Sequence, residues 1–77
     1  MAGHIYKTID LVGTSEVGIS EAVQAAVGRA SQTLKGLDWF EVGPVRGRIE
    51  NGRIAEYQVA VKIGFRVMSH DELQAEA

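Results

Sequence analysis

Alternating apolar and polar residues predict two β-strands in the second half of the chain, on either side of Asn51-Gly52. Asn-Gly between two such runs is the strongest short-range signal for a two-residue hairpin turn. This turn pairs Glu50 with Arg53 and sets the register of both strands. Continued along the hairpin, the register gives two apolar pairs and one pair of opposite charge: Val42–Val61, Phe40–Ile63 and Glu41–Lys62. We expect Gly43-Pro44 to interrupt this ladder with a β-bulge.

The two faces of the predicted hairpin differ in chemistry, because successive side chains of a strand point to opposite sides. One face is apolar and should cover a helix: Phe40, Val42, Tyr57, Val59, Val61, Ile63, Phe65 and Val67. The other face is mixed: Glu56, Gln58, Ala60, Lys62, Gly64 and Arg66. Trp39, the single tryptophan of the chain, lies opposite Gly64 on this second face. The pattern therefore places Trp39 on a face that the helix leaves uncovered.

The first half of the chain predicts one strand and one helix. Residues 5–12 are rich in β-branched and aromatic types, and turn-forming GTSEVG follows, so a strand ending near Val12 is expected. From Ser20 to Leu34, apolar residues recur at spacings of three and four, which predicts an amphipathic helix. Its apolar stripe consists of Ile19, Val23, Val27, Ala30 and Leu34. Ser15 or Ser20 could act as the N-cap, and Gly36 suits the left-handed position after the helix.

The lengths of these elements predict association between copies. A strand from Ile54 to Met68 would run about 50 Å at roughly 3.3 Å per residue. The helix would run only about 22 Å at roughly 1.5 Å per residue. One short helix cannot bury such a strand unless the sheet wraps tightly around it or the overhanging parts pack against other copies. We expect both, and therefore a homo-oligomer. We place a single domain at residues 1–68 and a flexible C-terminal tail at residues 69–77.

Composition narrows the classes of function. The chain has 77 residues, no cysteine, 8 Lys and Arg residues and a net charge of −2, so disulfides are excluded and nucleic-acid binding is disfavoured. No apolar run approaches the roughly 20 residues that span a bilayer, nor does the N-terminus carry a signal-peptide core. We therefore expect a cytoplasmic protein that binds neither nucleic acid nor membrane.

Catalytic and metal-binding patterns are weak. His4 and His70 lie near the termini, where a general base would be poorly held, so no catalytic residue is predicted. The sequence His70-Asp71-Glu72 could contact a metal, but a solvated tail is the better interpretation, and no metal site is predicted. GTSEVG lacks the spacing of both nucleotide-binding fingerprints and reads as a strand-to-helix turn.

Trp39 with its polar neighbours remains as the candidate site. An indole beside a glycine offers a flat stacking platform, and the amide of Gln58 suits a heterocycle edge carrying C=O and N–H groups. Phosphate could bind to Arg46, Lys62 or Arg66. The alternative is that Trp39 packs in a subunit interface, where tryptophan is enriched, with Gln58 and the arginines at its rim.

Four segments of the chain carry a family resemblance. YKTIDLVGTS, LDWFEV with VRGRI, and EYQVAVKIGFR, in this order and spacing, resemble the dodecins, small flavin-binding proteins, over roughly residues 4 to 68. The resemblance implies an α+β fold of order β-α-β-β, with a three-stranded antiparallel sheet wrapped around one α-helix. It also implies a hollow homododecamer built from trimers.

The same resemblance implies where a ligand binds. Flavins would bind in pairs, their rings stacked between symmetry-related copies of Trp39. Gln58 matches the glutamine that hydrogen-bonds the flavin ring, and Arg46 matches an arginine associated with ligand binding. Arg66 matches a position linked to flavin or coenzyme A contacts. The expected cofactor is FMN, riboflavin or a related flavin, with coenzyme A as a further candidate.

These observations favour non-catalytic flavin binding for storage, buffering or photoprotection. The first alternative is an oligomer that carries coenzyme A or acts as a scaffold. A flavin-dependent oxidoreductase is less favoured, because a ring between another flavin and a tryptophan leaves no face free for hydride transfer. A nucleic-acid stacking module is the weakest alternative, since the face offers one Trp and the chain is acidic.

Overall fold

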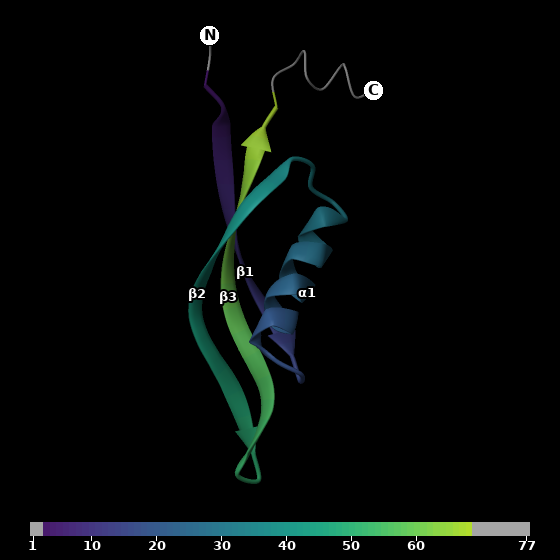
Figure 1. Cartoon of the computed structure of the whole chain (residues 1–77), viewed down its shortest axis with the longest axis vertical. Coiled ribbons are helices and arrows are strands. Elements are labelled where there is room, and N and C mark those ends of the chain that lie inside the picture. Colours follow the sequence, from purple (N-terminus) through teal and green to yellow (C-terminus); the bar gives the residue numbers. More distant parts are fainter. Residues whose placement is uncertain (1–2, 69–77) are drawn as a thin grey trace.

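The computed structural model describes residues 3–68, which form one helix and three strands in the order β-α-β-β. The elements are β1 (Ile5–Ser15), α1 (Ile19–Ser31), β2 (Leu37–Glu50) and β3 (Arg53–Val67). The strands form one antiparallel sheet of order β1-β3-β2. Figure 1 shows a long, curved sheet with α1 lying along one side and the β2–β3 hairpin extending past the helix. The α+β prediction is confirmed. The predicted tail, with His70, Asp71 and Glu72, lies outside the described residues.

β1 is three residues longer than predicted, because it continues past Val12 to Ser15. The Gly13-Thr14-Ser15 segment was expected to turn, but it stays paired with β3, where Gly13 lies opposite Val59. A ladder with a long partner strand thus outweighs the local turn preference. Gly13 also has a packing role, since a Cβ at this position would overlap the carbonyl oxygen of Ala22 in α1.

Both ends of α1 differ from the prediction. The N-cap is Gly18, without a side-chain capping bond, so neither Ser15 nor Ser20 caps the helix. Ser15 instead stabilises the preceding turn, where its Oγ accepts a hydrogen bond from the Val17 N–H at 2.9 Å. The helix ends at Ser31, three residues before Leu34. Gly36 has the predicted positive φ of 77°, but it lies in the connection to β2 rather than directly after the helix.

The core forms where α1 crosses β1 and β3. Its buried side chains are Ala22, Ala26 and Ala30 of the helix and Val59, Val61 and Ile63 of β3. Of the stripe predicted for the helix, only Ala30 is fully buried, while Val23, Val27 and Leu34 pack at the margin and Ile19 is 45% exposed. A row of alanines opposite Gly13 lets the helix backbone approach the sheet closely, which moves the larger side chains to the flanks.

The predicted hairpin pairs are confirmed from Glu50–Arg53 at the turn to Trp39–Gly64, as is the predicted bulge at Gly43-Pro44. A second irregularity lies near the tip, between Arg48 and Ile49. It shifts the register by one residue, and the bulge at Gly43-Pro44 shifts it back. Between the two, Arg46 pairs with Gln58. An uninterrupted hairpin would have paired Arg46 with Tyr57 on the helix side, so the irregularities turn Arg46 to the other face.

The apolar face of β2 is only partly covered, which corrects the expectation that Phe40 and Val42 pack under the helix. Phe40 is 55% exposed, and Val42 and Val45 are also exposed. α1 lies over β1 and β3, and a groove of about 390 Å³ remains between α1 and β2. Part of the predicted hydrophobic face is therefore left open in a single protomer.

Candidate ligand-binding surface

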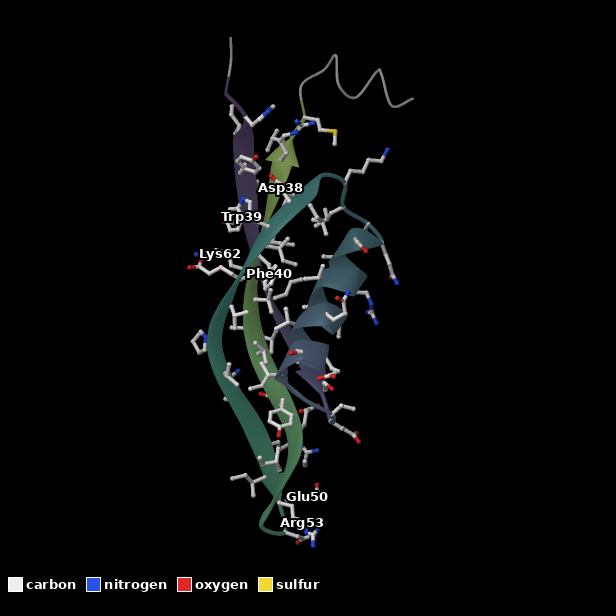
Figure 2. All side chains as sticks on the ribbon, in the orientation of Figure 1. Asp38, Trp39, Phe40, Glu50, Arg53 and Lys62 are labelled. Carbon is white, nitrogen blue, oxygen red and sulfur yellow. The ribbon has the colours of Figure 1, made fainter. Side chains whose placement is uncertain are left out.

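The side of the sheet opposite α1, called the outer face below, carries the predicted site residues. Trp39 lies on it, over Gly64: a Cβ built on this glycine would overlap the indole atoms Cδ2, Cε2 and Cζ2. Figure 2 shows Trp39 and Lys62 pointing away from the helix, whereas Phe40 points to the helix side. The indole is 40% exposed. Its orientation agrees with the sequence prediction, and it leaves one side available for stacking.

Tyr6 and Arg66 lie beside Trp39, and we call these three residues the tryptophan subsite. Tyr6 of β1 pairs with Arg66 of β3, and its ring centroid is 6.5 Å from that of Trp39 at an interplanar angle of 57°. This tilted geometry falls in the range that favours aromatic pairs. A hydrogen bond to the Asp38 carboxylate is the main cause that raises the pKa of Tyr6 above its usual value, while Arg66 acts in the opposite direction.

Asp38 reaches this position because β2 is irregular there. Leu37 pairs with Phe65 and Trp39 pairs with Gly64, so Asp38 is an extra residue in the ladder. In a regular strand, Leu37 and Trp39 would share a face. The irregularity lets Leu37 pack against the core while Trp39 stays on the outer face. Sequence reasoning missed Tyr6, because neither a local motif nor the hairpin turn indicates the register of β1. It missed Asp38 because the turn does not predict an extra residue in β2.

Arg46 and Gln58 form a second group, which we call the arginine–glutamine subsite. The Arg46 Nε donates a hydrogen bond to Gln58 Oε1 at 3.3 Å. Gln58 Nε2 donates in turn to Glu56 Oε1 at 3.0 Å. Nearby, Arg48 donates to Glu50 Oε2 at 2.9 Å. The amide of Gln58 is thus held in a defined orientation, with a guanidinium on one side and a carboxylate on the other.

Lys62 lies between the two subsites, and its cross-strand partners are the acidic residues Asp10 and Glu41. Next to this charged row is a shallow hollow of about 450 Å³, with Gly43 and Ala60 among its lining residues. With a carboxylate residue on each neighbouring strand, Lys62 is a poorer phosphate ligand than the sequence alone suggested. Arg46 and Arg66 remain the better candidates.

The four predicted site residues do not meet within one protomer. Trp39 pairs with Gly64 of β3, and Arg46 pairs with Gln58 of the same strand. The two partners are six residues apart along β3. At roughly 3.3 Å per residue, this separation is about 20 Å. The structure therefore brings Arg46 and Gln58 together, and Trp39 and Arg66 together, but keeps the two pairs apart. A single planar ligand would contact both subsites only where they come from different copies of the chain.

The described residues form neither a metal cluster nor a membrane-spanning helix. Within residues 3–68, no three His, Cys, Asp or Glu side chains come close enough together to hold a metal ion. In the same range, no helix is long and apolar enough to cross a membrane.

Comparison with known proteins links this geometry to one family. The family model described as Dodecin matches residues 5–68. The dodecin of Thermus thermophilus is 52% identical over 65 residues, which cover 84% of this chain and 94% of that protein. The solved structure of dodecin from Streptomyces coelicolor has a TM-score of 0.85 and 54% identity, and covers 90% of this chain and 99% of its own. The solved structure of the tt0972 protein from Thermus thermophilus has a TM-score of 0.83 and 51% identity. The match covers 87% of this chain and 98% of that protein's chain.

Proposed function

This chain belongs to the dodecin family, and on that premise we propose that it binds a flavin, FMN or riboflavin, without catalysing a reaction. The bound flavin would be stored, buffered or protected from light. Family membership implies that the chain assembles with copies of itself. We propose a homododecamer built from trimers, with flavin pairs held between symmetry-related copies of Trp39.

The orientation of Trp39 carries this proposal. Its indole lies on the outer face over Gly64, and it is neither buried in the core nor covered by the helix. An aromatic ligand stacked on this indole would gain about 0.5–1.5 kcal/mol beyond the burial of its area. Neither the helix side of the sheet nor the arginine–glutamine subsite offers a comparable platform.

The polar groups fit a flavin when two copies contribute. The amide of Gln58 supplies a donor and an acceptor, which match the N–H and C=O groups on the edge of the ring. The guanidinium of Arg46, hydrogen-bonded to Gln58, suits the phosphate of FMN. Because these groups lie about 20 Å along β3 from Trp39, the proposed site lies between protomers. This placement agrees with the oligomer that the family implies.

The chemistry of the proposed site is photophysical rather than catalytic. A flavin absorbs visible light and becomes reactive in its excited state. Contact with the electron-rich indole of Trp39 would shorten that state by electron transfer. A ring stacked on both faces also lacks the open side that a hydride donor needs. Both effects favour storage and protection over turnover.

Titration of FMN fluorescence with purified protein tests the proposal. We expect strong quenching by the wild type and a loss of affinity of at least about 10-fold for Trp39→Ala, because stacking and apolar burial are both lost. Trp39→Phe is the matched variant, and it should retain part of the affinity. Wild-type affinity in Trp39→Ala would contradict the site assignment.

The same experiment separates the alternative functions. A colourless protein that leaves FMN fluorescence unchanged but binds coenzyme A would indicate a coenzyme A carrier. Steady oxidation of NAD(P)H by the flavin-loaded protein would indicate an oxidoreductase. Either result would replace flavin storage as the function.

A further inference from the structure

Tyr6 is the aromatic neighbour of Trp39, yet it comes from the far edge of the sheet. Trp39 lies on edge strand β2, and its cross-strand partner Gly64 has no side chain. The tilted ring of Tyr6 reaches it from β1, across the central strand β3. Because Gly64 leaves space over the sheet, contacts at the edge of the indole decide which way the ring is held.

We propose that Tyr6 is a positioning residue for Trp39: its ring holds the indole over Gly64 in the orientation that receives the ligand. This role rests on the proposed flavin function, although part of its test does not. Tyr6 would act through Trp39, and contact with the ligand is not required. β1 would then contribute to ligand affinity from outside the hairpin that carries the other candidate residues.

Tyr6 is itself held by its neighbours on the other strands. The Asp38 carboxylate raises the pKa of the Tyr6 hydroxyl, through hydrogen bonding and through its charge. Arg66, its partner on β3, carries the opposing charge. Asp38 is the extra residue of the β2 ladder, directly before Trp39 in the sequence. One irregularity in β2 thus places the anchor of Tyr6 next to the indole that Tyr6 contacts.

A restrained indole should bind a planar ligand more tightly than a mobile one. Ordering a side chain on binding costs free energy, and a ring that is already ordered avoids most of that cost. Without Tyr6, the indole would retain its stacking surface but sample other orientations. The expected signature is weaker binding together with a more mobile Trp39.

Variants at Tyr6 test the proposal in the full-length assembled protein. Tyr6→Leu removes the ring, Tyr6→Phe removes only the hydroxyl, and Tyr57→Phe is the matched control on the helix side of the sheet. We expect FMN affinity to fall roughly 3- to 10-fold in Tyr6→Leu, as for the loss of one aromatic pair. Tyr6→Phe should lose less, and Tyr57→Phe should bind like the wild type. Equal affinity for Tyr6→Leu and Tyr57→Phe would overturn the proposal.

Trp39 fluorescence provides a readout that needs no ligand, because Trp39 is the only tryptophan. We expect lower emission anisotropy in ligand-free Tyr6→Leu than in wild type, with recovery in Tyr6→Phe. Circular dichroism and size-exclusion chromatography check that each variant folds and assembles. If the wild type fails to bind FMN, the proposed function is wrong, while the anisotropy still decides the role of Tyr6. Unchanged anisotropy in Tyr6→Leu would refute that role even if FMN binds.

The pH dependence tests the anchor at Asp38. The pKa of Tyr6 is raised above its usual value near 10. The contact with Asp38 is therefore complete below about pH 10 and is lost as the pH rises through the folded-state pKa. In Tyr57→Phe, where Tyr6 is the only remaining tyrosine, tyrosinate absorbance should titrate above the usual midpoint. Asp38→Asn should lower that midpoint, and an unchanged midpoint would contradict the anchor.

Discussion

Gly64 determines how closely the Trp39 indole can approach the sheet. The indole atoms occupy the space that any side chain at this position would need. Gly64 also lies within β3, three residues before its end, where the conformational freedom of glycine is a cost to the strand. The benefit is a flat aromatic surface against the backbone. This pair of residues connects strand geometry directly to the proposed stacking function.

Gly64→Ala should therefore displace Trp39 without removing it. A single methyl group would overlap the ring and push the indole away from the sheet. We expect FMN affinity to fall by about 10-fold or more, comparable to the loss of a stacking pair. Fluorescence titration measures this, and the emission maximum of Trp39 should shift in the ligand-free protein. An alanine variant with wild-type affinity and emission would show that the indole is not held where the structure places it.

Single residues also show what the sequence could predict. The Trp39–Gly64 pair followed from one Asn-Gly turn, because a two-residue loop fixes the register of the strands beside it. Gln58 was predicted on the uncovered face and Arg46 was a candidate ligand residue, but an uninterrupted hairpin would have placed the two on opposite faces. Their pairing depends on the register shift between Arg48 and Ile49, which no residue pattern near Arg48 indicates.

Between elements, Gly13 is the point of closest approach of β1 and α1. A Cβ there would overlap the carbonyl oxygen of Ala22, which belongs to the helix backbone and cannot rotate away. The buried alanines of α1 continue this close contact along β3. Helix and sheet are thus held together by small side chains, which explains why the stripe of larger apolar residues is not the buried one.

Gly13→Ala should destabilise the fold, because overpacking forces the helix away from the sheet. The expected cost is about 1–3 kcal/mol. Gly28→Ala is the matched control inside α1, where the new methyl group would meet only the Gln24 side chain at 4.0 Å. This control should stabilise the protein by about 0.5–1 kcal/mol. Denaturation midpoints at one fixed protein concentration compare the two, and equal effects would contradict the close packing at Gly13.

The elements themselves were easier to predict than their ends. Alternating apolar residues identified β2 and β3, and apolar residues at spacings of three and four identified α1. An enrichment in β-branched and aromatic residues identified β1. The boundaries of β1 and α1 each moved by about three residues. In β1, long-range pairing with β3 overrode a local turn signal. In α1, Leu34 fits the helical spacing but lies in the connection, because the chain must already turn toward β2.

For the whole protomer, the open apolar surface points to burial between copies. Phe40 is 55% exposed beside the groove between α1 and β2, and Ile49 near the hairpin tip is 74% exposed. β3 spans about 50 Å, whereas α1 spans about 20 Å, so the helix cannot cover both ends. Exposed apolar side chains gathered along a groove are typical of interaction sites. The length mismatch seen in the sequence thus agrees with the assembly that the family implies.

A charge in this surface should weaken assembly. Phe40→Asp would place a carboxylate in the apolar groove, where it would have to be desolvated on association. Analytical ultracentrifugation at micromolar concentration should show smaller species than for the wild type. Thr33→Asp adds the same charge at an exposed polar position and should assemble normally. Full assembly of Phe40→Asp would show that the groove faces solvent in the oligomer.

The sheet order β1-β3-β2 also has a consequence for biosynthesis. β1 and β2 both pair with β3 and not with each other, yet the ribosome makes both before it makes β3. A nascent chain that ends before Arg53 has no partner for either strand, so its sheet cannot begin to form. Pairing must then wait until β3 has left the exit tunnel, and the apolar segments of the emerging chain would be open to chaperones until that moment.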